Sequence, residues 1–328
     1  MSSHPEPIFD IAQLGHAELR TPRLEESVAF FTDIYGLTLV GESPGRAHLR
    51  AWNDDVLTSL TLTAAPAAGL DHVAWRATSP QALERRVAAL EEHGVEGTWH
   101  DGDFGHGKAY RYTGVGGHTQ EVYFETEKYV APPGEKPALP NQPQRFNPKG
   151  AAAAHIDHIN LLVPNVAEAS RFQQETLGFK LRERLVPAGR DEVGAWLSVM
   201  TKAHDLALTK EPAPTTGRLH HLAYAVPETS DVIRAADIFL ENEVFIEFGP
   251  AKHSRTQGFF LYVYEPGGNR VEVFTGGIHI FAPDFETVTW DTESQGRGTA
   301  WGLGVPESFH THATPVFEAT PVFEEAST

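Results

Sequence analysis

The sequence contains no cysteine, which excludes disulfide bridges, thiolate nucleophiles and cysteine-type zinc sites. It also has no apolar run long enough to cross a bilayer, and its N-terminus lacks the charged-then-apolar pattern of an export signal. Basic residues are few: 26 Lys and Arg stand against 44 Asp and Glu, a formal net charge of -18. This acidic balance argues against nucleic acid and anionic membranes as partners. We therefore expect a cytoplasmic protein with no nucleic-acid partner and no membrane partner.

The sequence contains one pattern four times, and the four copies form two similar halves. Each copy has a strand-like run, a helical run and further strand-like runs. The corresponding residues of the two halves are His16 and His158, Phe30 and Phe172, Gly36 and Gly178, His72 and His221, and Glu121 and Glu272. The first three pairs share an offset of 142 residues, which grows to 151 at the last pair, so the second half contains loop insertions. Repetition of this length indicates repeated structure.

Capping signals place the predicted helices. Thr21-Pro22 and Ser79-Pro80 are typical N-cap and first-turn pairs, and each precedes apolar residues at helical spacing. Gly36 and Gly94 supply the stops. A further helix is expected over about residues 230–242.

A unit of one helix and four strands exposes an apolar sheet face, and two such units side by side form a curved sheet whose concave face can hold a ligand. We therefore predict an α+β fold of four βαβββ modules, paired into two domains that are each a curved mixed sheet with helices outside. The predicted boundaries are 1–135 for the N-terminal domain, 136–152 for a linker, 153–288 for the catalytic C-terminal domain, and 289–328 for a lid and extended tail.

Three side chains of the second half are candidate metal ligands. The alternation that begins at Ile156 predicts a strand with Ile156, His158 and Asn160 on one face. His221 and Glu272 lie in later strand-like runs. Two imidazoles and one carboxylate on one face of an iron ion leave the opposite positions open for substrate and oxygen.

A histidine in the position of His158, taken alone, is more often a buried, hydrogen-bonded residue of the core than a metal ligand. Its register with His221 and Glu272 favours ligation. We expect the neighbouring His220 on the opposite strand face, in a structural role.

The motifs Asp157–Asn160, His220–Tyr224 and Arg270–Phe274 resemble those of type I extradiol ring-cleaving dioxygenases of the vicinal oxygen chelate superfamily. The resemblance covers about residues 10–305 and is nearest to the catechol 2,3-dioxygenase and homoprotocatechuate 2,3-dioxygenase branch. It implies that the two histidines and the glutamate named above bind Fe(II), with Mn(II) as the alternative. It further implies cleavage of a catechol by O2 next to the diol to give a muconic semialdehyde, in a homo-oligomer, with a tetramer favoured.

The same resemblance assigns further roles. His204 is similar to the family's acid–base histidine, Tyr262 to the tyrosine that hydrogen-bonds a ring hydroxyl, and His253 to the histidine paired with that tyrosine. The substrate-binding positions that it implies are Asn160, Trp196, Phe248, Arg297 and Trp301. Without the resemblance, Tyr262 and Trp196 would be plain core aromatics, and the segment with Arg297 and Trp301 a solvated tail.

The residues of the expected pocket bear on the substrate. Relatives that cleave homoprotocatechuate hold its carboxylate with arginines, whereas Phe248 occupies one such place here and Arg297 is followed by glycine. We therefore expect catechol or an alkylcatechol, with 3,4-dihydroxyphenylacetate as the alternative. Two rival functions are a glyoxalase-like lyase or isomerase, which would use Ni(II) or Zn(II), and a non-catalytic small-molecule binder.

The N-terminal half retains His16, His72 and Glu121, so it could hold a second metal. The repeat alignment, however, places Thr58 opposite the acid–base histidine and Arg111 opposite the ring-binding tyrosine, and an arginine repels a nearby cation. We interpret this half as a relic site, empty or structural. A ligand set drawn across both halves is a less favoured arrangement.

The C-terminal tail repeats a hexapeptide, first in Ala313–Glu318 and then in Ala319–Glu324. A proline in each copy favours an extended arm that docks on a neighbouring subunit, or else an unstructured tail.

Overall fold

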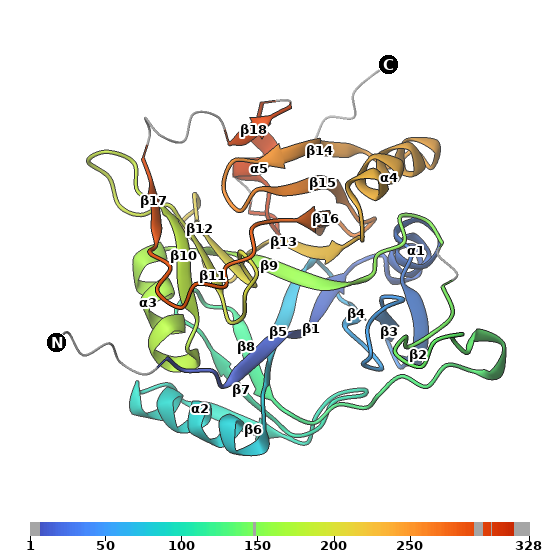
Figure 1. Cartoon of the computed structure of the whole chain (residues 1–328), viewed down its shortest axis with the longest axis horizontal. Helices are drawn as coiled ribbons and strands as arrows, with labels where there is room; N and C mark the ends of the chain where they lie inside the picture. Colours follow the sequence, from blue (N-terminus) through green and yellow to red (C-terminus); the bar gives the residue numbers. More distant parts are fainter. Residues whose placement is uncertain (1–6, 147–148, 292–297, 303, 318–328) are drawn as a thin grey trace.

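The computed structural model describes residues 7–146, 149–291, 298–302 and 304–317. Within them the predicted unit of one strand, one helix and three strands occurs four times (Figure 1). The units of the N-terminal half contain β1 (Ile11–Thr21), α1 (Leu24–Ala29) with its π-helical continuation η1 (Phe30–Tyr35), β2 (Thr38–Ser43), β3 (Arg46–Arg50) and β4 (Leu60–Ala64), then β5 (Gly69–Ala77), α2 (Pro80–Glu92), β6 (Gly97–His100), β7 (Ala109–Thr113) and β8 (Thr119–Tyr123).

The C-terminal half repeats this order after a short 3-10 turn, η2 (Pro133–Glu135). Its units contain β9 (His155–Val163), α3 (Val166–Leu177), β10 (Lys180–Leu185), β11 (Gly194–Ser198) and β12 (Leu206–Lys210), then β13 (Leu219–Ala225), α4 (Thr229–Glu241), β14 (Ile246–His253), β15 (Gly258–Tyr264) and β16 (Arg270–Gly276). The remaining elements are β17 (Val288–Trp290), β18 (Thr299–Trp301) and α5 (Glu307–Thr311).

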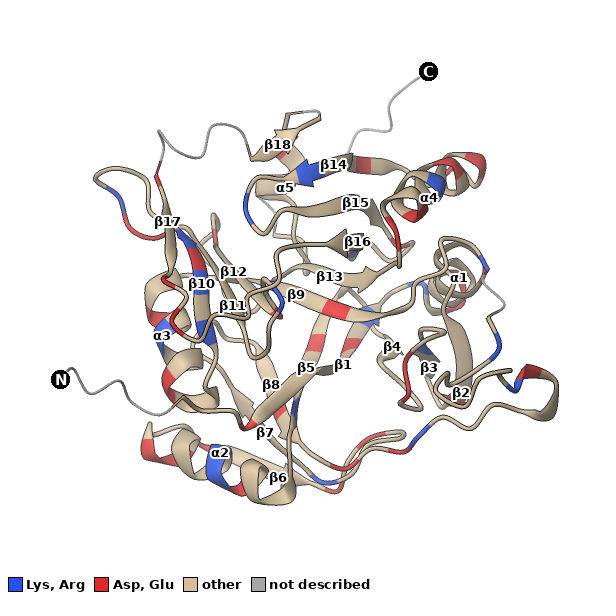
Figure 2. Ribbon diagram, viewed as in Figure 1, with Lys and Arg blue, Asp and Glu red and all other residues tan. Residues whose placement is uncertain are grey.

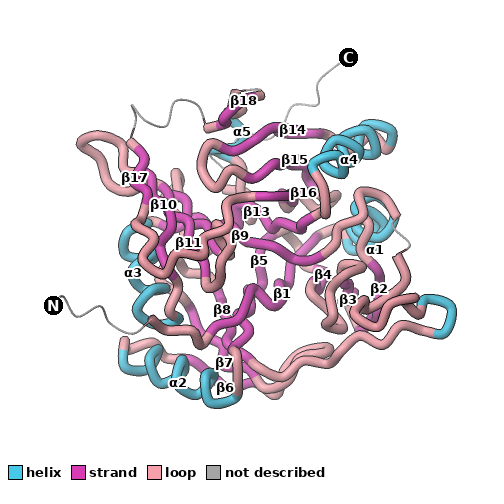
Figure 3. Tube along the Cα trace, viewed as in Figure 1, coloured by secondary structure: helices cyan, strands magenta, loops and turns pink. Residues whose placement is uncertain are grey.

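Each half forms one mixed sheet. The order of the first sheet is β2-β3-β4-β1-β5-β8-β7-β6, and that of the second is β17-β10-β11-β12-β9-β13-β16-β15-β14-β18. The leading strands of the two units, β1 with β5 and β9 with β13, are antiparallel neighbours at the centre of each sheet. Strands therefore occupy the middle of the molecule and helices its outside, as predicted (Figure 3). Acidic positions are spread over helices and loops around the fold (Figure 2).

One continuous apolar core joins the two halves. The ring of Trp75 packs edge-on against Phe179 of the other half, with ring centroids 4.9 Å apart. On the other side, the Tyr35 hydroxyl at the end of η1 donates to the backbone oxygen of Glu272 at 2.6 Å. The packing of the first half therefore helps to hold the backbone at a candidate ligand of the second.

The predicted helix stops are confirmed at Gly36, which ends η1 in the left-handed conformation with φ of 97°, and at Gly94, which follows the C-cap of α2 with φ of 75°. Gly178, the repeat equivalent of Gly36, ends α3 in the same way with φ of 79°. Ser79 caps α2 through a bond from the Ala82 amide, also as predicted. The cap predicted at Thr21 is wrong. Thr21 is the last residue of β1, and Arg23 takes the N-cap position without a side-chain cap.

The predicted lid and tail partly extend the second sheet. β17 pairs with β10 at one edge and β18 with β14 at the other. The described part of the first hexapeptide copy, residues 313–317, packs on its own chain, since Thr314 pairs with Leu219 through backbone bonds of 2.7 and 3.0 Å. The second copy lies outside the described residues. The end of the predicted linker is buried, with the Ala151 amide bonded to the Ile34 oxygen at 2.8 Å.

Among the described residues, no helix combines the length and the apolar character needed to cross a membrane.

Candidate metal centre and substrate cavity

Three adjacent strands bring the predicted ligands of the C-terminal half together. Ala223 of β13 lies opposite His158 of β9 on one side and opposite Glu272 of β16 on the other. His221 precedes Ala223 by two residues, so its side chain points to the same region. His158 Nε2 lies 2.9 Å from Glu272 Oε2, His221 Nε2 lies 3.2 Å from the same oxygen, and the two nitrogens are 3.3 Å apart. All three side chains are buried.

Two β-bulges correct the predicted strand faces. Asp157 is an extra residue of β9 against β13, so Ile156 turns into the apolar core instead of sharing the face of His158. His220 is an extra residue of β13, and it lines the same cavity as His221 rather than the opposite face. Alternation in a sequence carries no sign of an added residue, which is why both predictions were wrong.

Hydrogen bonds fix the tautomers of the two imidazoles. His158 Nδ1 lies 2.8 Å from Asp157 Oδ2, which holds a proton on Nδ1 and leaves Nε2 as the nitrogen that can bind a metal. His221 Nδ1 lies 2.7 Å from His220 Nδ1, and His220 Nε2 lies 2.8 Å from the Phe309 oxygen. If His220 donates to that oxygen, it accepts from His221, and His221 Nε2 is free as well.

Burial and charge give the triad one extra proton at neutral pH. Burial opposes the charged form of His158, but Glu272 and Asp157 raise its pKa to about 9. Burial lowers the pKa of His221 to about 4. The adjacent imidazoles hold the pKa of Glu272 well below its usual range in spite of burial.

The donor set fits a divalent metal with open positions. Apart from the imidazoles around it, the fully buried carboxylate of Glu272 has no hydrogen-bond partner among the described residues. Ligands about 2.1 Å from a metal and at right angles to one another are about 3.0 Å apart. The separations from 2.9 to 3.3 Å match one face of such an octahedron.

A cavity of about 720 Å³ opens beside the triad. The predicted residues Asn160, Trp196, Phe248, His204 and Tyr262 line it, together with His253. The His204 ring lies 4.0 Å from the His158 ring, and burial with the nearby His158 charge holds the pKa of His204 well below 6.5.

The predicted pair His253 and Tyr262 is in contact, with His253 Nε2 3.0 Å from the hydroxyl. His253 Nε2 also lies 3.6 Å from Glu272 Oε1. Burial and the Glu272 charge raise the pKa of Tyr262 well above its usual value, so the phenol keeps its proton.

One predicted substrate residue of the described part of the chain, Trp301, is not brought to the cavity. Trp301 is half exposed on the edge strand β18, where it packs against Phe259 at 5.2 Å, and it does not line the cavity. Arg297 lies outside the described residues.

The cavity also has lining residues that were not predicted. Among them are His220 of β13, Phe309 and His310 of α5, and the basic residues Arg190, Lys210 and Arg255. Of these residues, only Arg255 could have been found from the sequence, because it stands two residues after the predicted site residue His253. Helix α5 reaches the cavity only through tertiary packing, for which the sequence shows no motif.

The N-terminal half assembles a separate set. His16 lies opposite Ala74, which lies opposite Glu121, the register seen in the other half. His72 joins them, with its Nε2 3.6 Å from Glu121 Oε2. Arg111 pairs with Glu121 across the strands as Tyr262 does with Glu272, as the repeat alignment predicted. Because each set comes from one sheet, a ligand set shared between the halves does not form among the described residues.

Comparisons with known proteins agree with this geometry. The family model described as "Glyoxalase/Bleomycin resistance protein/Dioxygenase superfamily" matches residues 13–122 and 155–273. A metapyrocatechase of Geobacillus stearothermophilus is 44% identical over 95% of this chain and 96% of its own length. A manganese-dependent 2,3-dihydroxybiphenyl 1,2-dioxygenase of Geobacillus genomosp. 3 is 39% identical over 89% and 94%. The solved substrate complex of homoprotocatechuate 2,3-dioxygenase from Brevibacterium fuscum superimposes with a TM-score of 0.83 at 28% identity, over 94% of this chain and 93% of that chain.

Proposed function

We propose that this chain, which belongs to the glyoxalase/bleomycin resistance protein/dioxygenase superfamily and is an extradiol ring-cleavage dioxygenase, acts on catechol or an alkylcatechol. In this proposal, the ring is cleaved at an Fe(II) ion held by His158, His221 and Glu272. The observation that carries the assignment of the site is Glu272. Apart from the imidazoles that it faces, its buried carboxylate has no hydrogen-bond partner among the described residues. The relatives are named as dioxygenases, so a lyase or isomerase function is not proposed.

The metal, when bound, would gather the diol and O2 side by side and favour the ionised form of the diol. Nitrogen and carboxylate ligands suit iron and manganese alike. We propose Fe(II) as the native metal and Mn(II) as the alternative, because one relative is named as manganese-dependent. Metal analysis of the protein as isolated, with activity measured after loading each ion separately, decides between them.

Groups of this chain handle the protons. Tyr262 keeps its own proton, so its hydroxyl can donate to an oxygen of the substrate while His253 supports it at 3.0 Å. His204 is neutral at pH 7, so it can accept a proton from the bound substrate and return it later in the reaction. Asn160 and Trp196 bound the same cavity.

Metal binding at this site is expected to release a proton. At pH 7 the metal-free His158 is charged, because its pKa is about 9, and it must lose that proton to bind a cation. The apparent affinity should therefore fall about tenfold for each unit by which the pH falls below 9. Competition titrations with a chelator of known pH dependence measure this slope. An affinity that is constant between pH 7 and 9 would contradict it.

Catechol is expected to have a kcat/KM at least about tenfold above that of 3,4-dihydroxyphenylacetate, because burying a carboxylate without a partner costs more than ~1.4 kcal/mol. Phe248 stacks beside Tyr262 in an apolar cluster, so this wall offers a carboxylate no partner. Arg255 faces the cavity, but its charge is coupled to that of Glu183.

A preference for the acid would reverse this assignment and indicate that Arg255 or its basic neighbours bind the carboxylate. A preference for 3- or 4-methylcatechol over catechol supports it, since the cavity of about 720 Å³ has room for an alkyl group.

The decisive experiment is anaerobic loading with Fe(II) followed by addition of catechol and air. Oxygen uptake with one yellow ring-opened product per O2 supports the proposal. Loaded protein that binds catechol without consuming oxygen refutes it.

We also propose a cytoplasmic homo-oligomer, with a tetramer favoured. The absence of cysteine is compatible with a reducing compartment. Sedimentation of the metal-loaded chain gives the subunit number.

A further inference from the structure

The N-terminal half contains a cluster of three buried residues and one partly exposed residue that the dioxygenase reaction does not use. It consists of His16 on β1, His72 on β5, Glu121 on β8 and Asp103 in the loop between β6 and β7. One ligand atom from each residue lies within 4.8 Å of the other three. The first three occupy the strand positions that hold the candidate iron ligands in the other half. Asp103 is additional, since the C-terminal set has three members among the described residues.

The separations between ligand atoms in this cluster are longer than those in the C-terminal half. His72 Nε2 lies 3.3 Å from His16 Nε2 and 3.6 Å from both Glu121 Oε2 and Asp103 Oδ2. His16 Nε2 lies 3.7 Å from Glu121 Oε2. Four ligands about 2.0–2.1 Å from a central ion form a tetrahedron with edges of about 3.3–3.4 Å, longer than the edge of about 3.0 Å in an octahedron. These four of the six ligand–ligand separations are thus nearer to the edges of a tetrahedron than to those of an octahedron.

The orientation of His72 is that of a metal ligand. Its Nδ1 lies 3.1 Å from Asp71 Oδ1, so a carboxylate holds the proton on Nδ1 and directs Nε2 into the cluster. Asp157 does the same for His158 in the other half. His16 is buried, and its Nδ1 has no hydrogen-bond partner among the described residues, which leaves Nε2 as its only polar contact with the cluster.

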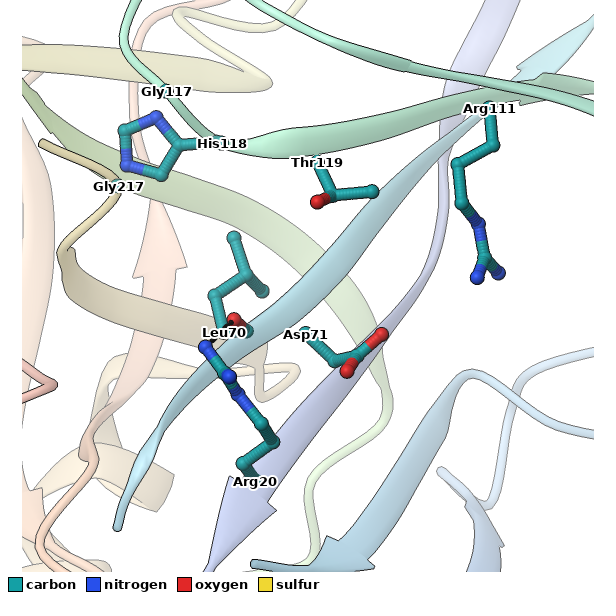
Figure 4. Close-up of a pocket in the computed structure, with 8 residues that line it drawn as sticks. All are labelled: Arg20, Leu70, Asp71, Arg111, Gly117, His118, Thr119 and Gly217. Atoms are coloured by element: carbon teal, nitrogen blue, oxygen red, sulfur yellow. Dashed lines mark hydrogen bonds between the residues drawn. The ribbon is translucent and has the colours of Figure 1, made fainter. Parts of the chain in front are cut away.

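Arg111 does not prevent a cation from binding. Its Nε donates to Glu121 Oε1 at 2.5 Å, and its NH2 group lies 3.1 Å from Asp103 Oδ2. Both Arg111 and Asp71 also line a polar cavity of about 310 Å³ next to the cluster (Figure 4). The carboxylates of Asp71, Asp103 and Glu121 and the guanidinium of Arg111 together leave a formal charge of −2, which a divalent cation neutralises.

We propose that His16, His72, Asp103 and Glu121 bind a second divalent cation in a closed four-coordinate site of the kind that zinc occupies. All positions on the ion are then taken by the protein, so it has no place for a substrate and its role is structural. A structural role also agrees with the repeat alignment, because Thr58 stands where the other half has the acid–base residue His204. Each chain would then carry one closed and one open metal site.

Metal stoichiometry of the full chain tests this proposal without any activity measurement. After incubation with Zn(II) and removal of free metal, the wild-type chain should retain two equivalents, measured by plasma mass spectrometry. Glu272→Gln and Glu121→Gln should each retain one, and the double variant none. A wild-type chain that retains a single equivalent, lost entirely in Glu272→Gln, would overturn the proposal.

Cobalt(II) spectroscopy gives a second measurement that does not require Glu121→Gln to fold. Added to the Glu272→Gln chain, Co(II) should produce the intense visible bands of a four-coordinate site. Asp103→Asn in the same background should weaken binding by at least about tenfold and reduce these bands. Weak bands typical of six-coordination, or a spectrum unaffected by Asp103→Asn, would exclude the closed site. Failure of the dioxygenase assay bears on neither result.

Discussion

The Glu272→Gln chain is expected to lose one metal equivalent and its ring-cleavage activity together. The amide keeps the size of the side chain but removes the negative charge that two imidazole nitrogens face at 2.9 and 3.2 Å. Changes to residues that merely support a ligand lower metal affinity by about 10–100-fold, and loss of a ligand itself should exceed that range. Metal analysis after gel filtration and oxygen uptake with catechol measure the two effects.

The matched control is Glu241→Gln, the same change at an exposed position at the end of α4. It should retain the metal content and activity of the unaltered chain. A Glu272→Gln chain that keeps full metal and full turnover would remove this carboxylate from the site, whereas equal losses in both variants would indicate a general effect of charge. Circular dichroism distinguishes loss of metal from loss of fold, because it reports secondary structure and not metal content.

Repetition is what made the architecture predictable. His16 and His158 occupy equivalent positions within β1 and β9, and a residue spacing that recurs in both halves indicates repeated tertiary structure. Once β1 is paired with β5 and β9 with β13, the register follows, and with it the meeting of His221 and Glu272. Gly36 was also predictable, because a left-handed helix end strongly favours glycine.

Features that depend on an added residue or a distant contact were not predictable. The bulge at Asp157 sends Ile156 into the core, and the bulge at His220 turns that side chain into the cavity. Both changes reverse a face without altering the hydrophobic pattern. Thr21 has the chemistry of a helix cap, yet strand pairing with Ala64 keeps it in β1, so tertiary structure outweighed the local signal.

The fourth ligand candidate of the N-terminal half shows the same limit. Asp103 lies in the loop between β6 and β7, which carries no sequence motif, and only the folded chain places it near His72. Its presence changes the interpretation of Arg111. As a lone neighbour of Glu121 the arginine repels a cation, but with a second carboxylate it balances a site that would otherwise carry excess negative charge. Two halves with one register therefore support different coordination geometries.

The His204→Phe chain is expected to keep its metal and its affinity for catechol while kcat falls by about 100-fold or more, the usual contribution of a positioned acid or base. The phenyl ring fills a similar volume against His158, whose ring lies 4.0 Å away, but it cannot carry a proton. Because the pKa of His204 is held well below 6.5, the wild-type group is neutral at pH 7, and acid should lower the rate only as that imidazole becomes charged.

In His204→Phe this acid limb should disappear from the pH profile of kcat, an effect that altered packing alone would not cause. His93→Phe, the same replacement at an exposed position after α2, serves as the control and should leave both kcat and the profile unchanged. Equal kcat values for His204→Phe and wild type would exclude a proton-transfer role for His204. A lower kcat with the acid limb intact would assign His204 to packing against His158 and leave the proton transfer to Tyr262 and His253.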